Sequence, residues 1–306
     1  MQRLQHVGMN CGCEYTRFPL FRRLERYTRY QHSVGVARIV WHFTHDVKQA
    51  AAALLHDIAT PVFAHVIDFM NGDHLRQEST EQHTSDIIAG SDELQACLHK
   101  YGLTTADVEN YHLYPVADND TPRLSADRLE YTFGNVVNFG ITSPDNVQTW
   151  YRNLIVGRNE EGVDELMFTD PQLAEQFALA ALRASQIYVC PEDRYAMQMM
   201  AEMLARCIRK GLITHADLYT TEPEVIAKLL RTDEGTREWQ HFQNIYQMIP
   251  AANHPDARRI PAKKRYINPY VCNMGRVADL SPTFSDALTQ FLALSFDEPI
   301  CGKSHR

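Results

Sequence analysis

The chain has 306 residues, of which 44% are hydrophobic, and its formal net charge is −8. That length and apolar content support one large or two modest domains with a complete core, so the fold needs no disulfide or metal ion to hold it together. Lys and Arg are scattered and no segment approaches the roughly 20 apolar residues that span a bilayer, which argues against a dedicated nucleic-acid surface and against membrane insertion.

The N-terminal residues give no reason to expect export. Residues 1–8 contain Arg3 and His6 but no apolar run of the signal-peptide type. The seven cysteines are odd in number and irregularly spaced, so no disulfide framework is expected and the predicted location is the reducing cytoplasm. Cys11 and Cys13 form a C-x-C pair without a second ligand pair, which favours two thiols in a turn over a zinc site.

Helical periodicity dominates the rest of the chain. Apolar residues recur at helical spacing between residues 33 and 58, and Pro61 ends this region. A shorter periodic segment covers 63–70 and stops at Asn71-Gly72. Further helices are predicted at 81–89, 92–101, 122–137, 144–154, 170–188, 192–210, 223–231 and 234–248, and short strands only at 154–156 and 265–271.

The C-terminal part is less regular. Residues 253–264, with two prolines and five basic residues, are the best candidate for a linker. We therefore expect an all-α fold, with one helical region to about residue 250 and an appendage after it.

Four side chains that can bind a metal ion occupy predicted helix ends. His32 lies just ahead of one helix, the pair His56-Asp57 closes the next, and Asp127 opens a third. Two neutral imidazoles and two carboxylates form a mixed donor set that suits manganese, iron, nickel, zinc or magnesium. Four protein ligands leave positions for water and a substrate oxygen on an ion that accepts five or six, as metal-assisted hydrolysis requires.

A His-Asp dipeptide also arises by chance in a chain with fourteen histidines. At the end of an apolar helix, a His and an ionisable Asp are costly to bury without a partner, and a metal ion is one natural compensation. Helix caps and salt bridges are others, so the residue types alone leave this choice open.

Four motifs follow one another in a distinctive order: QRL at 2–4, RYQHSVGV at 29–36, LLHDIATPVFAH at 54–65 and SADRLEY at 125–131. Together they resemble the motifs of the HD phosphohydrolases. Their order and their residues are most similar to those of the deoxynucleoside triphosphate triphosphohydrolase branch. That family's pattern is roughly Q-R-L, R-F-x-H-S-x-G-V, L-x-H-D-x-G-x-x-P-F-S-H and D-x-D-R-x-D-Y. The resemblance covers about residues 2–137 and, more faintly, 150–210.

The resemblance implies an HD-domain helical bundle with a helical C-terminal extension and a small irregular tail. The parts would be a phosphohydrolase core at 1–150, an extension completing the pocket at 151–250 and an appendage at 251–306. It also implies one divalent metal ion per chain, and it leaves a homo-oligomer open because relatives in this branch often assemble. The implied metal ligands are His32, His56, Asp57 and Asp127.

The resemblance further implies that His65 and Asp68 act on the phosphates, with His65 as a phosphate contact or proton carrier. Residues three apart on a helix share a face, and a carboxylate beside an imidazole favours its protonated, phosphate-binding form. A surface His-Asp pair is the alternative. The candidate substrate contacts are Arg29, Arg128, Tyr131 and Tyr188, with salt bridges as the alternative for the arginines and a core position for Tyr188.

Several positions depart from the family pattern. Thr60 stands where this branch often has a histidine, and Asn135 where many relatives have an aspartate near the sugar. In the helix that resembles the family's H-E-x-x-S, Thr80 takes the place of the histidine, and His83 could serve as the catalytic residue if the helix is shifted by one turn. The basic run at 263–265 could approach phosphates, although such runs are more often solvated.

The sequence therefore predicts a metal-dependent phosphohydrolase that cleaves a nucleotide phosphoester or phosphoanhydride, with a deoxynucleoside triphosphate as first choice. A nucleoside monophosphate phosphatase and a cyclic-nucleotide or alarmone hydrolase are alternatives on the same scaffold, because fold does not fix substrate. A catalytically weak nucleotide sensor and a di-iron HD oxygenase are the alternatives from other classes. The oxygenase would need extra ligands, for which only His65, His74 and His83 are candidates.

Overall fold

The computed structural model describes residues 1–72, 83–251, 254 and 256–305. Within that part helices dominate, and short strands form one four-stranded and one two-stranded sheet. The predicted helical architecture is confirmed in outline, but the all-α description is only approximate because of the two sheets.

The elements of the described chain follow in sequence order. The α-helices are α1 (Arg29–Thr44), α2 (Val47–Leu55), α3 (Val66–Met70), α4 (Thr84–Ala89), α5 (Asp92–Lys100), α6 (Thr105–Val108), α7 (Ala126–Asn138), α8 (Pro144–Arg152), α9 (Pro171–Tyr188), α10 (Pro191–Arg209), α11 (Glu222–Leu229), α12 (Asp233–Gln243), α13 (Val277–Leu280) and α14 (Pro282–Leu292). The 3-10 helices are η1 (Gln2–His6), η2 (Cys13–Tyr15), η3 (Tyr111–Leu113) and η4 (His215–Tyr219). The strands are β1 (Leu154–Arg158), β2 (Asp164–Phe168), β3 (Ile245–Ile249), β4 (Tyr270–Val271), β5 (Gly275–Arg276) and β6 (Cys301–Ser304).

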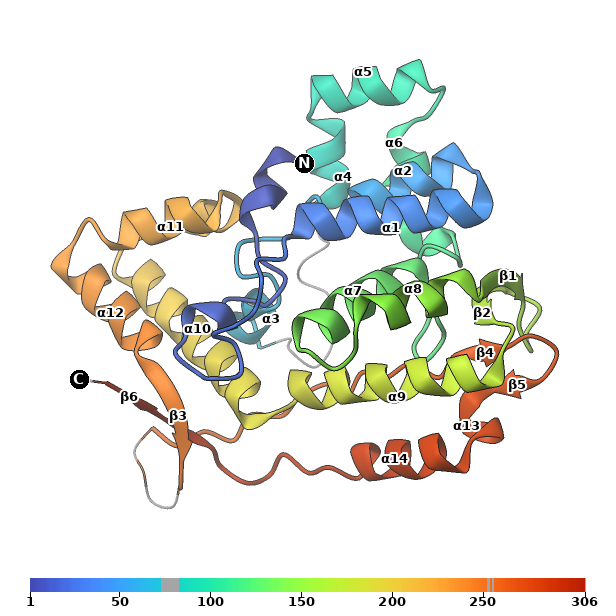
Figure 1. Cartoon of the computed structure of the whole chain (residues 1–306). Helices are drawn as coiled ribbons and strands as arrows, with labels where there is room; N and C mark the ends of the chain where they lie inside the picture. The colour runs from blue at the N-terminus through green and yellow to red at the C-terminus, as the bar shows by residue number, and fades with distance from the viewer. Residues whose placement is uncertain (73–82, 252–253, 255, 306) are drawn as a thin grey trace.

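Two groups of helices build the molecule. In one, α1 contacts α2 and α7, and α7 contacts α9 (Figure 1). In the other, α10 contacts the short helix α3 and the helix α12, while α11 contacts α12. Each group surrounds its own cluster of buried apolar side chains. Leu55 and Ile58 on either side of the His56-Asp57 turn belong to the first cluster, and Val62 belongs to the second, so the chain passes from one group to the other just after this turn.

Helix caps fix where the first two helices begin. Thr28 and Gln31 form a capping box that starts α1 at Arg29. Asp46 caps α2 by accepting hydrogen bonds from two backbone N–H groups of its first turn. His32 therefore lies in the first turn of α1 and not ahead of the helix as predicted, because the capping box starts the helix four residues earlier than the apolar stripe does.

The sheets show what local periodicity misses. The strand predicted at 154–156 is confirmed within β1, whereas only Tyr270–Val271 of the segment 265–271 forms a strand. The helix predicted at 234–248 is wrong beyond Gln243, because β3 follows and pairs antiparallel with β6 from the far end of the chain. A pairing between segments so distant leaves no local sequence signal.

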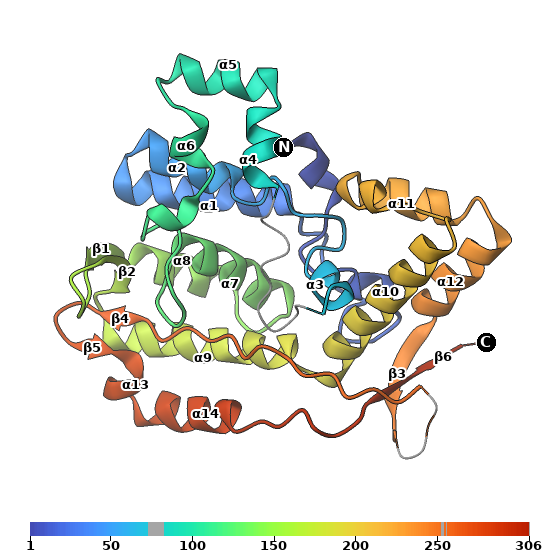
Figure 2. The same ribbon diagram turned by 180° about the vertical axis from the view of Figure 1, so that it is seen from behind.

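The described part of the C-terminal segment contains regular helices and strands, so the prediction of a small irregular tail is wrong. It runs back along α9, adds β4 and β5 to the sheet of β1 and β2, and then forms α13 and α14 (Figure 2). Phe284 and Phe291 of α14 lie in the same apolar cluster as Val36 of α1. Burial of these two rings explains why the tail is held in place. The division at residues 150 and 250 stays a prediction.

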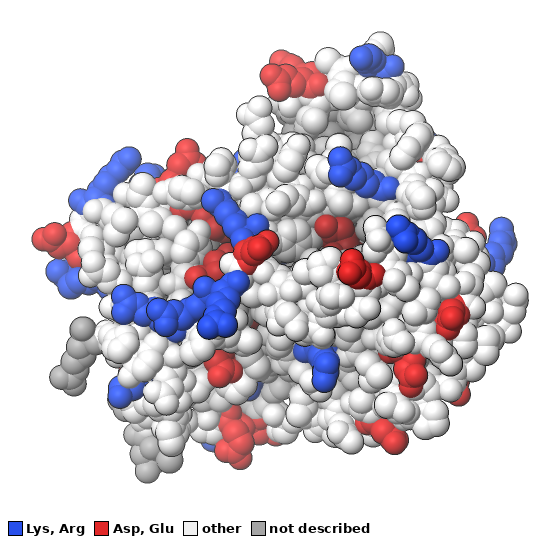
Figure 3. Space-filling model, viewed as in Figure 1, with Lys and Arg blue, Asp and Glu red and all other residues white. Residues whose placement is uncertain are grey.

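The face of the molecule drawn in Figure 3 carries charges of both signs. On one face, acidic and basic groups are mixed, with one concentration of basic groups over the region of α10 (Figure 3). Among the described residues, no helix combines the length and apolar character that a membrane span requires. The absence of a nucleic-acid surface stays a prediction.

If the C-terminal segment completes the core, Phe284→Ala should lower the free energy of unfolding by about 3–5 kcal/mol, because Phe284 is fully buried. Leu292→Ala is the matched control on the same helix, since Leu292 is 43% exposed, and it should change stability by no more than about 0.5 kcal/mol. Chemical denaturation followed by circular dichroism measures both. Equal effects of the two substitutions would contradict the integration of the tail.

Candidate metal centre

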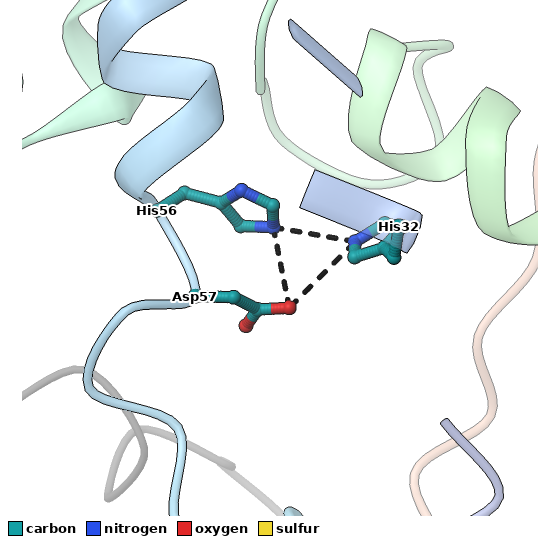
Figure 4. Close-up of side chains that lie close together, drawn as sticks. All are labelled: His32, His56 and Asp57. Carbon is teal, nitrogen blue, oxygen red and sulfur yellow. Dashed lines mark hydrogen bonds and ion pairs between the residues drawn. The ribbon is translucent and has the colours of Figure 1, made fainter. Parts of the chain in front are cut away.

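The ends of three helices bring together the four predicted ligands. His32 comes from the first turn of α1, His56 and Asp57 follow the last residue of α2, and Asp127 lies in the first turn of α7. The side chains of His32, His56 and Asp57 point toward one another (Figure 4). Their ligand atoms all lie within 4.8 Å of one another, which makes them a group that can hold a metal ion.

The interatomic distances describe a compact centre. The Nε2 atoms of His32 and His56 are 3.2 Å apart, and Asp57 Oδ2 lies 3.8 and 3.5 Å from them. Asp127 lies outside this three-residue group, but its Oδ1 is 2.9 Å from His32 Nε2 and 3.7 Å from His56 Nε2. Ligand nitrogens about 2.1 Å from one ion lie roughly 3 Å apart, so the spacing of the two imidazoles fits a shared ion.

Hydrogen bonds behind the histidines turn their Nε2 atoms toward the centre. The Nδ1 atom of His56 bonds to the carbonyl oxygen of Ala53 at 2.7 Å. The Nδ1 atom of His32 contacts Glu130 Oε2 at 2.5 Å, and Glu130 also accepts a hydrogen bond from the hydroxyl of Tyr27. Metal-binding histidines usually have such a partner on the second ring nitrogen, because it fixes the tautomer and the ring orientation.

Gly35 makes room for the contact between Glu130 and His32. A Cβ atom at Gly35 would lie 2.3 Å from Glu130 Oε1 and 2.6 Å from its Cγ. Glu130 was not predicted from the sequence. It lies three residues after Asp127 on α7, and this spacing places both side chains on the same face of the helix, which was a usable signal.

Neighbouring charges outweigh burial in setting the pKa values of His32 and Asp57. Burial opposes a charged His32, yet Glu130 and Asp127 together raise the pKa of His32 to about 10. Although burial acts to raise it, the pKa of Asp57 lies well below its usual range because of Arg29, His56 and His32. The carboxylates therefore hold positive charge in their midst, which a metal ion supplies more fully than a proton does.

Asp57 is held from two sides. Arg29 Nη1 donates to Asp57 Oδ2 at 3.0 Å, and the hydroxyl of Thr60 donates to Asp57 Oδ1 at 2.7 Å. Thr60, which departs from the family pattern, thus positions the carboxylate. The role of Arg29 as a phosphate contact stays a prediction, because its guanidinium both pairs with Asp57 and lines the cavity.

A cavity of about 220 Å³ adjoins the centre. All four predicted ligands line it, together with the predicted contacts His65, Arg29, Tyr131 and Tyr188. Side chains from the N-terminal loop, α10 and the C-terminal segment complete the wall, and sequence reasoning did not place most of them there. These further lining residues are Met9, Asn10, Cys11, Phe21, Phe69, Tyr111, Asn135, Phe139, Asp193, Arg194, Met197, Ala262, Lys263 and Arg265.

His65 and Asp68 form the pair that their spacing predicted. His65 Nδ1 lies 2.9 Å from Asp68 Oδ2, and the Asp68 side chain is fully buried. Burial nevertheless lowers the pKa of His65. Asp68 acts to raise this pKa, as expected, but burial together with the charges of Arg265 and Arg29 outweighs it. The residues before it, Phe63 and Ala64, have φ angles of 59° and 45°, so left-handed backbone leads into this pair.

The structure does not support the two other predicted site residues. Arg128 is turned away from the cavity: its guanidinium pairs with Asp118 at 3.2 Å and donates to carbonyl oxygens of the 119–123 loop. It therefore has the salt-bridge role that was its alternative. His83 is half exposed and lies against Tyr219 and Asp86, outside the cavity wall. Thr80 and His74 lie outside the described residues.

Comparison with known proteins places this site in a family context. Residues 29–126 match the HD domain family. The chain is 27% identical over 225 residues to YdhJ of Bacillus subtilis, an alignment that covers 72% of this chain and 66% of YdhJ, just under two thirds of that protein's length. It is 26% identical to the metal-dependent phosphohydrolase cns2 of Cordyceps militaris, over 85% of this chain and 68% of cns2.

A solved structure shares the fold. A phosphohydrolase from Bacteroides thetaiotaomicron superposes with a TM-score of 0.61 at 13% identity, covering 99% of this chain and 93% of that one. The matches support the HD-domain metal-dependent phosphohydrolase superfamily that the sequence motifs predicted. These matches do not identify the deoxynucleoside triphosphate triphosphohydrolase branch.

If Glu130 orients His32, Glu130→Gln should lower the affinity for a divalent ion by about 10- to 100-fold, because the ring loses its charged partner. Titration of the metal-free protein against a chelating dye measures the affinity. Glu93→Gln is the matched control, since Glu93 is exposed on α5. An unchanged affinity in Glu130→Gln would show that the contact does not support the centre.

Proposed function

We propose that this chain, a metal-dependent hydrolase with an HD domain, removes the phosphate from a small phosphomonoester, with nucleoside monophosphates as the first class to test. The observation that carries the proposal is the His32–His56–Asp57 group at the wall of one cavity. Its ligands would be His32, His56, Asp57 and Asp127. A divalent ion bound there lowers the pKa of a water and polarises a phosphoryl oxygen.

The residues that line the cavity favour a monophosphate over the deoxynucleoside triphosphate of the first hypothesis. The cavity has a volume of about 220 Å³ and is partly open to solvent. Two groups expected along a triphosphate, Arg128 and His83, lie outside the wall. One phosphate near the metal centre and one ring system are a better match to this space.

The wall has the chemistry that such a substrate needs. Tyr111, Tyr131, Phe139 and Tyr188 contribute aromatic surface for a base or sugar. Arg29, Lys263 and Arg265 contribute positive charge for phosphate oxygens. Lys263 and Arg265 belong to the basic run at 263–265 that was predicted as a possible phosphate contact.

His65 is the proposed proton carrier. Burial keeps its imidazole neutral, and the Nδ1–H bond to Asp68 leaves Nε2 without a proton. Nε2 can then accept a proton from the attacking water and return it to the leaving oxygen. Asp68 positions the ring for both steps.

The competing classes find less support. A di-iron oxygenase needs a second set of ligands, and among the described residues only one group of three or more His, Cys, Asp or Glu side chains can hold an ion. A nucleotide sensor would not need His65 and Asp68 beside the centre. We therefore place hydrolysis first.

His56→Ala should lose most bound metal and all measurable hydrolysis, because water cannot replace a protein ligand without loss of affinity. Elemental analysis gives the metal content, and product analysis over nucleoside monophosphates, cyclic nucleotides and deoxynucleoside triphosphates gives the reaction. Orthophosphate from a monophosphate supports the proposal, whereas tripolyphosphate would assign the triphosphate reaction. His99→Ala, exposed on α5, is the control, and full metal occupancy in His56→Ala would refute the ligand assignment.

His65→Ala should keep its metal and lower turnover by about 10²- to 10⁴-fold, the usual scale for a positioned acid or base. His83→Ala should retain turnover at equal metal content, because His83 lies outside the cavity wall. Steady-state kinetics on the metal-loaded proteins compares the two. Loss of metal in His65→Ala would make His65 a ligand, and an equal loss of turnover in His83→Ala would restore the shifted helix as part of the site.

A further inference from the structure

The cavity has a second group of polar side chains, away from the metal centre. Asn135 follows Asp127 by eight residues on α7, which places it about 12 Å farther along the helix axis. Tyr188 ends α9, and Asp193 lies in the first turn of α10. All three line the same cavity as Asp127. Because Asn135 lies more than two helical turns beyond Asp127, we expect the second group to face the rest of a substrate whose phosphate is at the metal centre.

Asn135 offers an unused hydrogen-bond acceptor. Its Nδ2 donates to the hydroxyl oxygen of Tyr188 at 2.7 Å, which fixes the orientation of the amide. Its Oδ1 has no partner among the described residues, although Asn135 is only 7% exposed. Buried acceptors are seldom left without a donor, so this end of the cavity is built to receive one from a ligand.

Asp193 is a carboxyl group with only a weak protein partner. Cys13 Sγ donates to its Oδ1 at 3.7 Å, and thiols are weak donors. Among the described residues, no Lys, Arg or His lies within ion-pair distance of it. Burial raises the pKa of Asp193 to about 7, and Cys13 and Arg194 act to lower it without offsetting the effect of burial.

The neighbouring arginine is already engaged. Arg194 donates to the carbonyl oxygens of Val189 and Ile260, and its guanidinium lies 4.6 Å from the centre of the Phe296 ring. These three contacts fix Arg194 to backbone and ring, and among the described residues it forms no ion pair with Asp193, although its charge acts to lower the pKa of Asp193. Asp193 therefore presents unfilled acceptor capacity to the cavity.

We propose that Asp193 is a specificity-determining residue that accepts a hydrogen bond from a hydroxyl or amino group on the leaving part of the substrate. This inference rests on the proposed function and deepens it. The selected substrates are phosphomonoesters of polar alcohols, such as nucleosides, whereas esters without a second donor gain nothing at this end. A carboxyl group here also disfavours a second phosphate, since like charges would meet in an enclosed space.

The test is Asp193→Asn, which keeps the size of the side chain, with Glu192→Gln as the matched control. Glu192 is the adjacent acid on α10 and does not line the cavity. The probes are AMP, IMP, 2′-deoxy-AMP, 2′,3′-dideoxy-AMP and p-nitrophenyl phosphate. IMP lacks the amino group of AMP, the two deoxy analogues lack one or both sugar hydroxyls, and the last probe has no donor beyond its phosphate. Metal content and binding of adenosine to the metal-free protein are measured alongside kcat/KM.

Asp193→Asn should lower kcat/KM for AMP by about 10- to 100-fold, the scale of one hydrogen bond to a charged group. Hydrolysis of p-nitrophenyl phosphate and metal content should stay within about twofold of the parent protein, and adenosine binding should weaken. The penalty should vanish for the analogue that lacks the donor, since removing both partners of one contact is not additive.

An equal loss on AMP and p-nitrophenyl phosphate, no loss on either, or the same loss in Glu192→Gln would overturn the role of Asp193. If the parent protein hydrolyses none of the probes, the proposed function fails instead. Adenosine binding to the metal-free protein then still tests the contact: weaker binding in Asp193→Asn supports it, and unchanged binding refutes it.

Discussion

Enclosed negative charge around two imidazoles is the constraint on which the site depends. Asp57, Asp127 and Glu130 all approach His32 or His56, and burial makes an uncompensated carboxylate costly. Burial opposes a charged His32, yet Glu130 and Asp127 raise its pKa to about 10, so these carboxylates favour a positive charge between them. A divalent ion satisfies the same demand and adds Lewis acidity. The arrangement of these carboxylates therefore favours a cation at the centre, whichever substrate binds beside it.

The fold meets this constraint by placing each ligand at a helix end, where caps fix the backbone. The capping box at Thr28 sets the position of His32, and the end of α2 sets His56 and Asp57. Arg3 adds a clamp from the N-terminus, because its guanidinium donates to the carbonyl oxygens of Ile58 at 2.9 Å and Thr60 at 2.7 Å. Helix ends and one long side chain thus hold the turn rigidly, which a preorganised metal site needs.

Sequence reasoning succeeded where the chemistry is local and failed where it is not. His65 and Asp68 lie one helical turn apart, so their pairing could be predicted from spacing. The neutral state of His65 could not, because it depends on burial and on Arg265, which is 200 residues away in the chain. Arg128 carries the right residue type beside a ligand, but the direction of its side chain is decided by the loop that ends at Arg123. The strand β3 depends on a partner near the C-terminus in the same way.

The part of the chain that matches the HD domain contains most of the proposed metal site, whereas other parts of the chain supply much of the cavity wall. The four proposed ligands and His65 lie within or one residue beyond residues 29–126, the part that matches the HD domain. Asn10, Asp193 and Arg265 lie outside it, yet they line the same cavity, which lies between the two apolar clusters of the core. Metal chemistry can therefore persist while these outer walls change. For that reason the substrate has to be inferred from the residues that line this cavity. Similarity to the HD domain does not by itself identify the substrate.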